Sequence, residues 1–287
     1  MSIDQSTNPC VAQLIDANLD RAREGLRVIE DWCRFGLNKK DLVVLLKDCR
    51  QQLGKHHHQI YKNARATAKD QGIGLSHPAQ FNRDSPERII SANCARVQEA
   101  LRVIEEFTRT TDPPLSTSAS KIRYALYDLE ITILKASIQK KRQQKLQCCH
   151  LCLITSPKEG LSRTVEKALG KGLKMVQYRC KDGTDSERLL EAKELAALCK
   201  EHDALFIIND RVDLALAVDA DGVHLGQDDI PTNAARNLLG AEKLIGRSTH
   251  CMEELRKAEN EGCNYLGVGP TYSTQTKPNQ KPTGVSY

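Results

Sequence analysis

Polar and charged side chains that could bind a metal or an anion follow a series of short apolar segments in the second half of the chain. The groups that follow each segment in turn are Gln177, Arg179 and Lys181; Asn209 and Asp210; Gln227 and Asp229; Ser248; and Thr274, Thr276 and Lys277. Two carboxylates with bound waters suit Mg²⁺, which is usually held by one or two carboxylates plus the phosphates of a ligand. Arg179, Lys181 and Lys277 could then neutralise the remaining phosphate charge.

The apolar segments alternate with amphipathic stretches such as 186–202 and 252–261, and this alternation predicts parallel strands covered by helices. The expected strands are 151–154, 175–178, 205–208, 222–225, 244–246 and 265–268. Their spacing is typical of a (β/α)₈ TIM barrel, of which about six βα units are present. In such barrels function collects on the loops after the strands, which is where the polar groups stand.

Two of the carboxylates have a simpler interpretation when taken singly. Asp210 could cap a helix beginning at Arg211, and Asp228 or Asp229 could cap one near Pro231. Capping is favoured for each residue alone. Their common place on one rim favours a diphosphate–metal site.

The first half of the chain contains an internal repeat. Residues 17–34 align with 92–109 at an offset of 75, with ten identities in 18 positions, and Leu-Arg-Val-Ile-Glu occurs in both copies. Each copy pairs this helix with a second, expected at 41–61 and 116–140, which predicts duplicated helical hairpins. We therefore expect an all-α domain over 1–146, followed by the barrel over 147–287.

Some polar residues of the helical half need an explanation. Asn18, Arg21, Asn93 and Arg96 fall within the apolar face of the repeat helix, where they could form a structural network or an anion site. The triplet 56–58 is all histidine. Consecutive helical residues point about 100° apart, so a solvated face is favoured over a metal site.

Composition narrows the class of protein. The chain has 287 residues, 40% hydrophobic and 28% charged, without a signal peptide or a membrane span, so a cytoplasmic globular protein is expected. Its 11 cysteines are scattered and favour reduced thiols. The net charge of +5 comes from the first half, where 24 Lys+Arg face 17 Asp+Glu. With 4% aromatic residues and no recognition motif, nucleic-acid binding is disfavoured.

The motifs of the second half resemble those of thiamine-phosphate synthases. The similar segments are Asn209-Asp210-Arg211, the run 221–229, and Gly269-Pro270-Thr271 through Thr276-Lys277-Pro278, within about 151–285. The resemblance implies a transferase that joins a hydroxymethylpyrimidine diphosphate to a thiazole phosphate, releases pyrophosphate and requires Mg²⁺. A dissociative displacement needs little general base and much charge stabilisation of the leaving group.

The resemblance also implies roles for particular residues, matched position by position. Those for the pyrimidine diphosphate are Gln177, Arg179, Lys181, Asn209, Ser248 and Lys277; those for Mg²⁺ are Asp210 and Asp229; those for the thiazole phosphate are Thr274, Gln275 and Thr276. Arg179, Ser248 and Lys277 are expected to be catalytic, because they would stabilise the departing pyrophosphate.

Alternatives remain open at this point. Only six of the eight strands of the family are present, so we expect the chain of 287 residues to be poorly soluble and nearly inactive. A thiazole tautomerase-like isomerase and a non-catalytic phosphate-binding or assembly protein are the competing hypotheses. The helical half could serve dimerisation, giving a homo-oligomer, or act as a cap, or perform a step on the same pyrimidine phosphate pathway.

Overall fold

The structure is a computed structural model that describes residues 8–69, 71, 74, 75, 78, 83–273 and 281–285. Contacts divide the chain into two compact units, residues 1–137 and 138–287, and each is described by itself. All eleven cysteines are free thiols. Among the helices that the structure describes, none combines the length and the apolar character that crossing a membrane requires.

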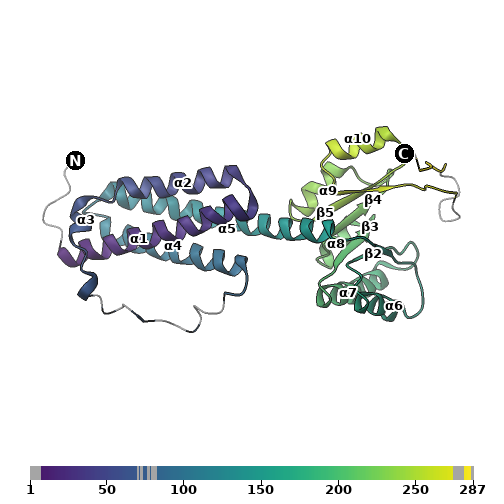
Figure 1. Ribbon diagram of the computed structural model, residues 1–287, viewed down its shortest axis with the longest axis horizontal. Coiled ribbons are helices and arrows are strands. Elements are labelled where there is room, and N and C mark those ends of the chain that lie inside the picture. Colours follow the sequence, from purple (N-terminus) through teal and green to yellow (C-terminus); the bar gives the residue numbers. More distant parts are fainter. Residues whose placement is uncertain are drawn as a thin grey trace. The chain divides into compact units, whose positions relative to one another are not determined.

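The first unit is helical (Figure 1). Its elements are α1 (Pro9–Asp31), η1 (Trp32–Leu37), α2 (Lys40–Lys55), α3 (Gln59–Asn63), η2 (Thr67–Lys69), α4 (Pro86–Thr108) and α5 (Pro113–Gln147), whose last ten residues belong to the second unit. The duplicated helices α1 and α4 begin alike, each with a proline in the first turn and a capping side chain, Asn8 or Ser85, before it.

Helices α1 and α4 pack closely at Gly25. A Cβ on this glycine would lie 2.5 Å from Cγ2 of Val97, so a larger residue would push the helices apart. The structural network considered for the polar residues of these two helices does not form. Asn18 and Asn93 each donate to a carbonyl four residues earlier in their own helix, while Arg21 and Arg96 are exposed.

The histidine triplet also differs from expectation, because His57 is buried rather than solvated. Its Nε2 lies 2.7 Å from Oδ1 of Asp16, another buried residue. Arg65 binds Asp16 through two nitrogens and reaches Asp20 as well. Burial raises the pKa of the Asp16 carboxyl, but hydrogen bonds from Arg65 and His57 outweigh it and leave the pKa lowered.

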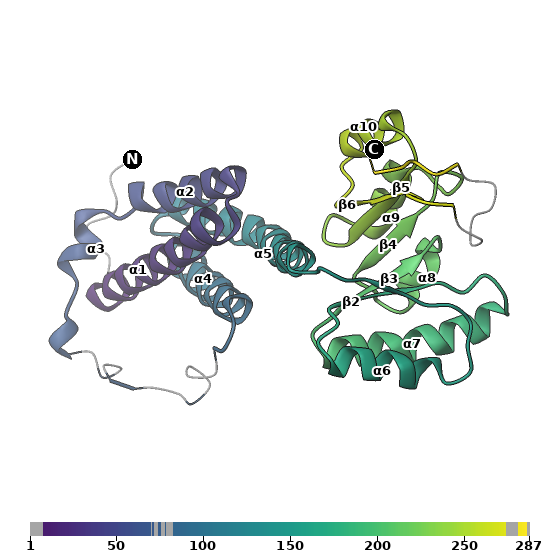
Figure 2. The same cartoon turned by 45° about the vertical axis from the view of Figure 1, so that its right-hand side comes forward.

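The second unit contains six parallel strands in sequential order, separated by helices that lie around them (Figure 2). The strands are β1 (Leu153–Ile154), β2 (Met175–Tyr178), β3 (Leu205–Asn209), β4 (Gly222–Leu225), β5 (Leu244–Thr249) and β6 (Tyr265–Val268); the helices are α6 (Leu161–Gly170), α7 (Asp185–Glu201), α8 (Val212–Ala217), α9 (Thr232–Leu239) and α10 (Met252–Asn260). The predicted six parallel strands of a TIM-type barrel are confirmed, and within the described residues the first five of them are each followed by a helix.

Alternate residues of each strand face opposite sides of the sheet. Val176, Phe206 and Val223 belong to the core shared with the helices. Residues of the opposite parity form a second apolar cluster on the inner face, made of Met175, Leu205, Ile207 and Leu244 with Leu146, Cys149, Cys152 and Tyr265 against it. The inner face is therefore apolar where the strands begin.

The end of α5 fastens to the loops that precede the strands. The Arg142 guanidinium donates to Asp221, just before β4, and to the carbonyl of Glu242, just before β5. Leu146, one turn further on, joins the inner cluster. The cavity on the inner face extends from these amino-end residues, among them Leu146 and Cys149, to polar residues near the carboxyl ends, such as Asn209 and Ser248.

Candidate active site

A polar layer follows the apolar one on the inner face of the sheet. It consists of Gln177 from β2, Asn209 from β3, His224 from β4 and Ser248 from β5, all bordering an open cavity of about 930 Å³. Gln177 Nε2 donates to Asn209 Oδ1 over 2.8 Å, which leaves the carbonyl of Gln177 and the amide of Asn209 for a ligand. Such a pair can recognise a polar ring edge.

The carboxylates of Asp210 and Asp229 lie next to each other at the end of β3 and in the loop after β4. Asp210 has a left-handed backbone, with φ of 63°, and its N–H donates to the carbonyl of His224 over 2.8 Å. Burial, and then the hydrogen bond and charge of Asp229, raise the pKa of Asp210 to about 6. Two carboxylates held this close repel unless a proton or a cation lies between them.

The capping interpretation of these carboxylates is wrong. Helices α8 and α9 begin after Arg211 and Pro231, and no side chain caps either. Asp229 instead accepts a hydrogen bond from Gly226 N at 2.6 Å, which turns its carboxylate back toward the strand end. The paired oxygen donors fit the preference of Mg²⁺ for carboxylates, because a divalent cation would remove the repulsion that raises the pKa of Asp210.

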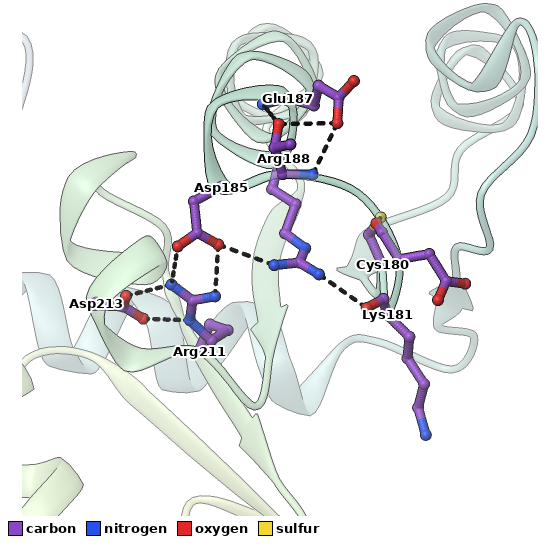
Figure 3. Close-up of polar contacts among 9 residues, drawn as sticks. Cys180, Lys181, Asp185, Glu187, Arg188, Arg211 and Asp213 are labelled. Carbon is purple, nitrogen blue, oxygen red and sulfur yellow. Dashed lines mark hydrogen bonds and ion pairs between the residues drawn. The ribbon is translucent and has the colours of Figure 1, made fainter.

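Two of the predicted cations follow β2. The side chain of Arg179 borders the cavity, and its backbone N–H donates to Thr155 Oγ1 over 2.9 Å, which fixes the strand end. Lys181 is exposed in the next loop. Arg188 holds that loop by donating to the Lys181 carbonyl over 2.8 Å, and Figure 3 shows the lysine side chain extending away from the surrounding ion cluster.

An ion cluster joins the loop after β2 to the loop after β3 (Figure 3). Arg211 contacts Asp185 at the start of α7 and Asp213 in α8, and Asp185 also accepts from Arg188. Hydrogen bonds from Arg211, then from Arg188, lower the pKa of Asp185. Because Arg211 directly follows Asp210, the cluster ties the loop of Lys181 to the carboxylate pair. This connection was not predicted from the sequence.

The end of β5 is fixed to the loop after β4. Gln227 Nε2 donates to the carbonyl of Ser248 over 2.5 Å, and the buried Arg247 donates to the carbonyl of Ile230 over 3.0 Å. Ser248 Oγ lies 3.0 Å from Nε2 of His224, whose Nδ1 lies 3.2 Å from the hydroxyl of Tyr265. His224 and Tyr265 were not predicted as site residues, although their strand positions face the polar layer.

The structure brings together most of the predicted residues. Around the cavity and its rim lie Gln177, Arg179, Asn209, Asp210, Asp229 and Ser248, with Lys181 in the adjoining loop. Thr274, Gln275, Thr276 and Lys277 lie outside the described residues. Fold and site together define a barrel-type α/β protein whose strand ends suit an anionic ligand bound with a metal ion.

Comparison with known proteins agrees with this class. The family described as thiamine monophosphate synthase matches residues 151–287, and the family described as ThiD2 matches residues 13–132. A thiamine-phosphate synthase of Prochlorococcus marinus (strain MIT 9303) is 66% identical over 282 residues, covering 96% of this chain and 80% of the relative. One from Parasynechococcus marenigrum (strain WH8102) is 59% identical, covering 100% and 82%.

The chain therefore belongs to the thiamine-phosphate synthase family, whose members are transferases of thiamine biosynthesis. Among solved structures, a thiamine phosphate pyrophosphorylase from Pyrococcus furiosus is similar, with 34% identity and a TM-score of 0.44, covering 50% of this chain and 68% of that one. The curated relatives confirm the resemblance inferred from the sequence.

Proposed function

We propose that the chain joins a hydroxymethylpyrimidine diphosphate to a thiazole phosphate with release of pyrophosphate. The observation that carries this proposal is the Asp210–Asp229 pair beside a cavity bordered by Gln177, Arg179 and Asn209. The pair suits a metal-bound diphosphate, and the amide groups suit a pyrimidine edge. Family membership supports the reaction type.

In this proposal Asp210 and Asp229 hold Mg²⁺, which supplies positive charge against the diphosphate oxygens. Gln177 and Asn209 orient the pyrimidine through the amide groups that their mutual hydrogen bond leaves over. Arg179, Lys181 and Ser248 bind the diphosphate and stabilise the negative charge that grows as the bond to it breaks.

Lys277 is assigned to the same diphosphate, and Thr274, Gln275 and Thr276 to the thiazole phosphate. These assignments rest on the sequence motif alone. The division of the chain into a helical domain over 1–146 and a barrel domain over 147–287 stays a prediction, as do a cytoplasmic location and a homo-oligomer. Limited proteolysis with mass analysis of the fragments tests the domain boundary.

The test of the proposed function is direct formation of thiamine phosphate from the two substrates by the purified protein. Product is expected with Mg²⁺ and is expected to disappear with a chelator and in Asp210→Asn. Asp228→Asn changes an exposed neighbour of Asp229 and serves as the matched control. Conversion of the thiazole phosphate without any pyrimidine diphosphate would favour an isomerase instead.

A further inference from the structure

Three side chains from neighbouring strands form a chain of hydrogen bonds on the inner face. Tyr265 of β6 lies 3.2 Å from Nδ1 of His224 on β4, and Nε2 of the same ring lies 3.0 Å from Oγ of Ser248 on β5. The His224 and Tyr265 rings are tilted by 36° with centroids 5.4 Å apart. The cavity borders all three residues.

Two glycines make room for this arrangement. A Cβ on Gly246 of β5 would lie 2.1 Å from Cζ of Tyr265, so the phenol ring can cross the strand only because the side chain is absent. A Cβ on Gly267 of β6 would lie 2.9 Å from Cε1 of His224. Real Cβ contacts do not occur at such distances, so the sequence of these strands is adapted to the positions of both rings.

The direction of the protons follows from the chemistry of the groups. A phenol can donate or accept a hydrogen bond, and among the described residues Nδ1 of His224 is the partner of the Tyr265 hydroxyl. If the phenol accepted from Nδ1, its own proton would face no acceptor among these residues, so the arrangement favours Tyr265 as the donor. Desolvation raises the pKa of Tyr265, which keeps the phenol protonated. A neutral imidazole that accepts at Nδ1 carries its proton on Nε2, which lies 3.0 Å from Ser248 Oγ and can therefore donate to that hydroxyl.

The direction of these hydrogen bonds determines where the hydroxyl proton of Ser248 points. With Oγ accepting from His224, the hydroxyl of Ser248 has its own proton left for an acceptor in the cavity. In the reverse arrangement Ser248 would donate to the ring and turn lone pairs toward an anion, which would repel it. The direction of the chain therefore decides whether Ser248 attracts or repels a diphosphate.

We propose that His224 is a positioning residue that, held in one tautomer by Tyr265, orients the hydroxyl of Ser248 as a hydrogen-bond donor to the diphosphate. This inference rests on the proposed function, which places the diphosphate beside Ser248. It adds two residues, His224 and Tyr265, that act through the hydroxyl of Ser248.

The first experiment reads the tautomer. Long-range ¹H–¹⁵N spectra of the ¹⁵N-histidine-labelled protein are expected to show His224 protonated at Nε2, with His224→Gln identifying the resonance. Tyr265→Phe removes the phenolic donor and is expected to give a mixture of tautomers, while Tyr272→Phe at an exposed tyrosine changes nothing. A wild-type ring protonated at Nδ1 would overturn the proposal.

The second experiment measures binding of magnesium pyrophosphate by calorimetry. Ser248→Ala is expected to lose about tenfold in affinity, the lower range for a hydrogen bond to a charged group. His224→Leu is expected to lose a similar factor. His224→Gln, whose amide can accept from Tyr265 and donate to Ser248, should retain affinity within about threefold of the wild type.

The decisive comparison combines variants. Tyr265→Phe is expected to weaken binding about threefold in the wild-type background and not at all when Ser248 is already alanine, because the effect passes through the hydroxyl. Equal losses in both backgrounds would show that Tyr265 only packs, and the proposal would fail. If the protein forms thiamine phosphate but the affinity losses are additive, this inference alone is rejected. Pyrophosphate binding with the expected coupling but without product rejects the proposed reaction alone. Wild-type protein that does not bind magnesium pyrophosphate rejects both.

Discussion

Replacing Asp210 by asparagine should stabilise the metal-free protein while abolishing its response to Mg²⁺. Asparagine keeps the shape of the side chain and tolerates the left-handed backbone found here. What changes is the charge. The pKa of Asp210 rises from 3.8 to about 6 because burial and Asp229 disfavour the carboxylate. Keeping the group ionised at neutral pH therefore costs folding free energy.

The size and the pH range of this effect follow from the same shift. At about 1.4 kcal/mol for each tenfold change in proton affinity, the penalty reaches at most about 3 kcal/mol, and solvent screening of this partly exposed group reduces it to about 1–2 kcal/mol. A raised carboxyl pKa means that the penalty is absent below pH 3.8 and complete above about 6. The advantage of Asp210→Asn should be about half as large at pH 5.

Hydrogen exchange of peptides from β3 and β4 is the appropriate assay, because the chain has two units and a single midpoint need not describe it. Without metal, Asp210→Asn should slow exchange at pH 7.5. Mg²⁺ at ten times its dissociation constant should protect the wild type by about 1.4 kcal/mol and leave the variant unchanged. Asp228→Asn is the control. Faster exchange in the metal-free variant, or an intact Mg²⁺ response, would refute the reasoning.

Three further outcomes are expected. His57→Ala should lower the free energy of unfolding of the helical unit by about 1.5–3 kcal/mol, because it removes a hydrogen bond to the buried Asp16 carboxylate, as urea titration of Trp32 fluorescence would show. Because the pKa of Asp16 is lowered, its carboxylate contributes folding stability at pH values above the ordinary pKa of 3.8. An acid titration of the same fluorescence should show this contribution being lost as the pH falls through the lowered pKa. Gly246→Ala should destabilise the second unit by about 1–3 kcal/mol by overpacking against Tyr265, and unchanged calorimetric stability would contradict the close contact.

The strands were predictable because their apolar runs are short and bounded by turns. The ranges 175–178, 222–225 and 265–268 match β2, β4 and β6 as predicted. The first strand is shorter than expected, covering Leu153–Ile154, because Leu151 is exposed in the segment that leads from α5. Periodicity detects burial on a sheet, and it says little about a segment that is apolar but only half covered.

Side-chain partners were less predictable than elements. Nothing in the triplet of histidines distinguishes His57. Its side chain is buried because the following helix α3 packs against α1, which brings His57 into contact with Asp16 of α1. Likewise, the side chains of Asn18 and Asn93 donate hydrogen bonds to backbone carbonyls of their own helices, which a helical wheel does not reveal. Local pattern placed Asn18 and Asn93 on the buried face correctly but misplaced Arg21 and Arg96, which are exposed, and it does not show which distant element supplies a partner.

The candidate site combines residues positioned by strands with residues positioned by loops, and the two groups should behave differently. Asn209 pairs in register with His224, and the next bond, from Asp210 N to the His224 carbonyl, continues the same ladder. The parallel sheet therefore places these three residues before any ligand arrives. Lys181 depends instead on a side-chain contact from Arg188, within an exposed ion cluster that salt can weaken.

Increasing ionic strength should consequently affect the residues positioned by loops before those positioned by strands. The loop of Lys181 should exchange its amide hydrogens faster as salt weakens the cluster around Arg211, while peptides of β3 and β4 keep their protection. A protein whose strand ends and loops loosen together would show that the site is held as one unit. Separate responses would mean that the sheet holds the strand-end residues independently of the loop of Lys181.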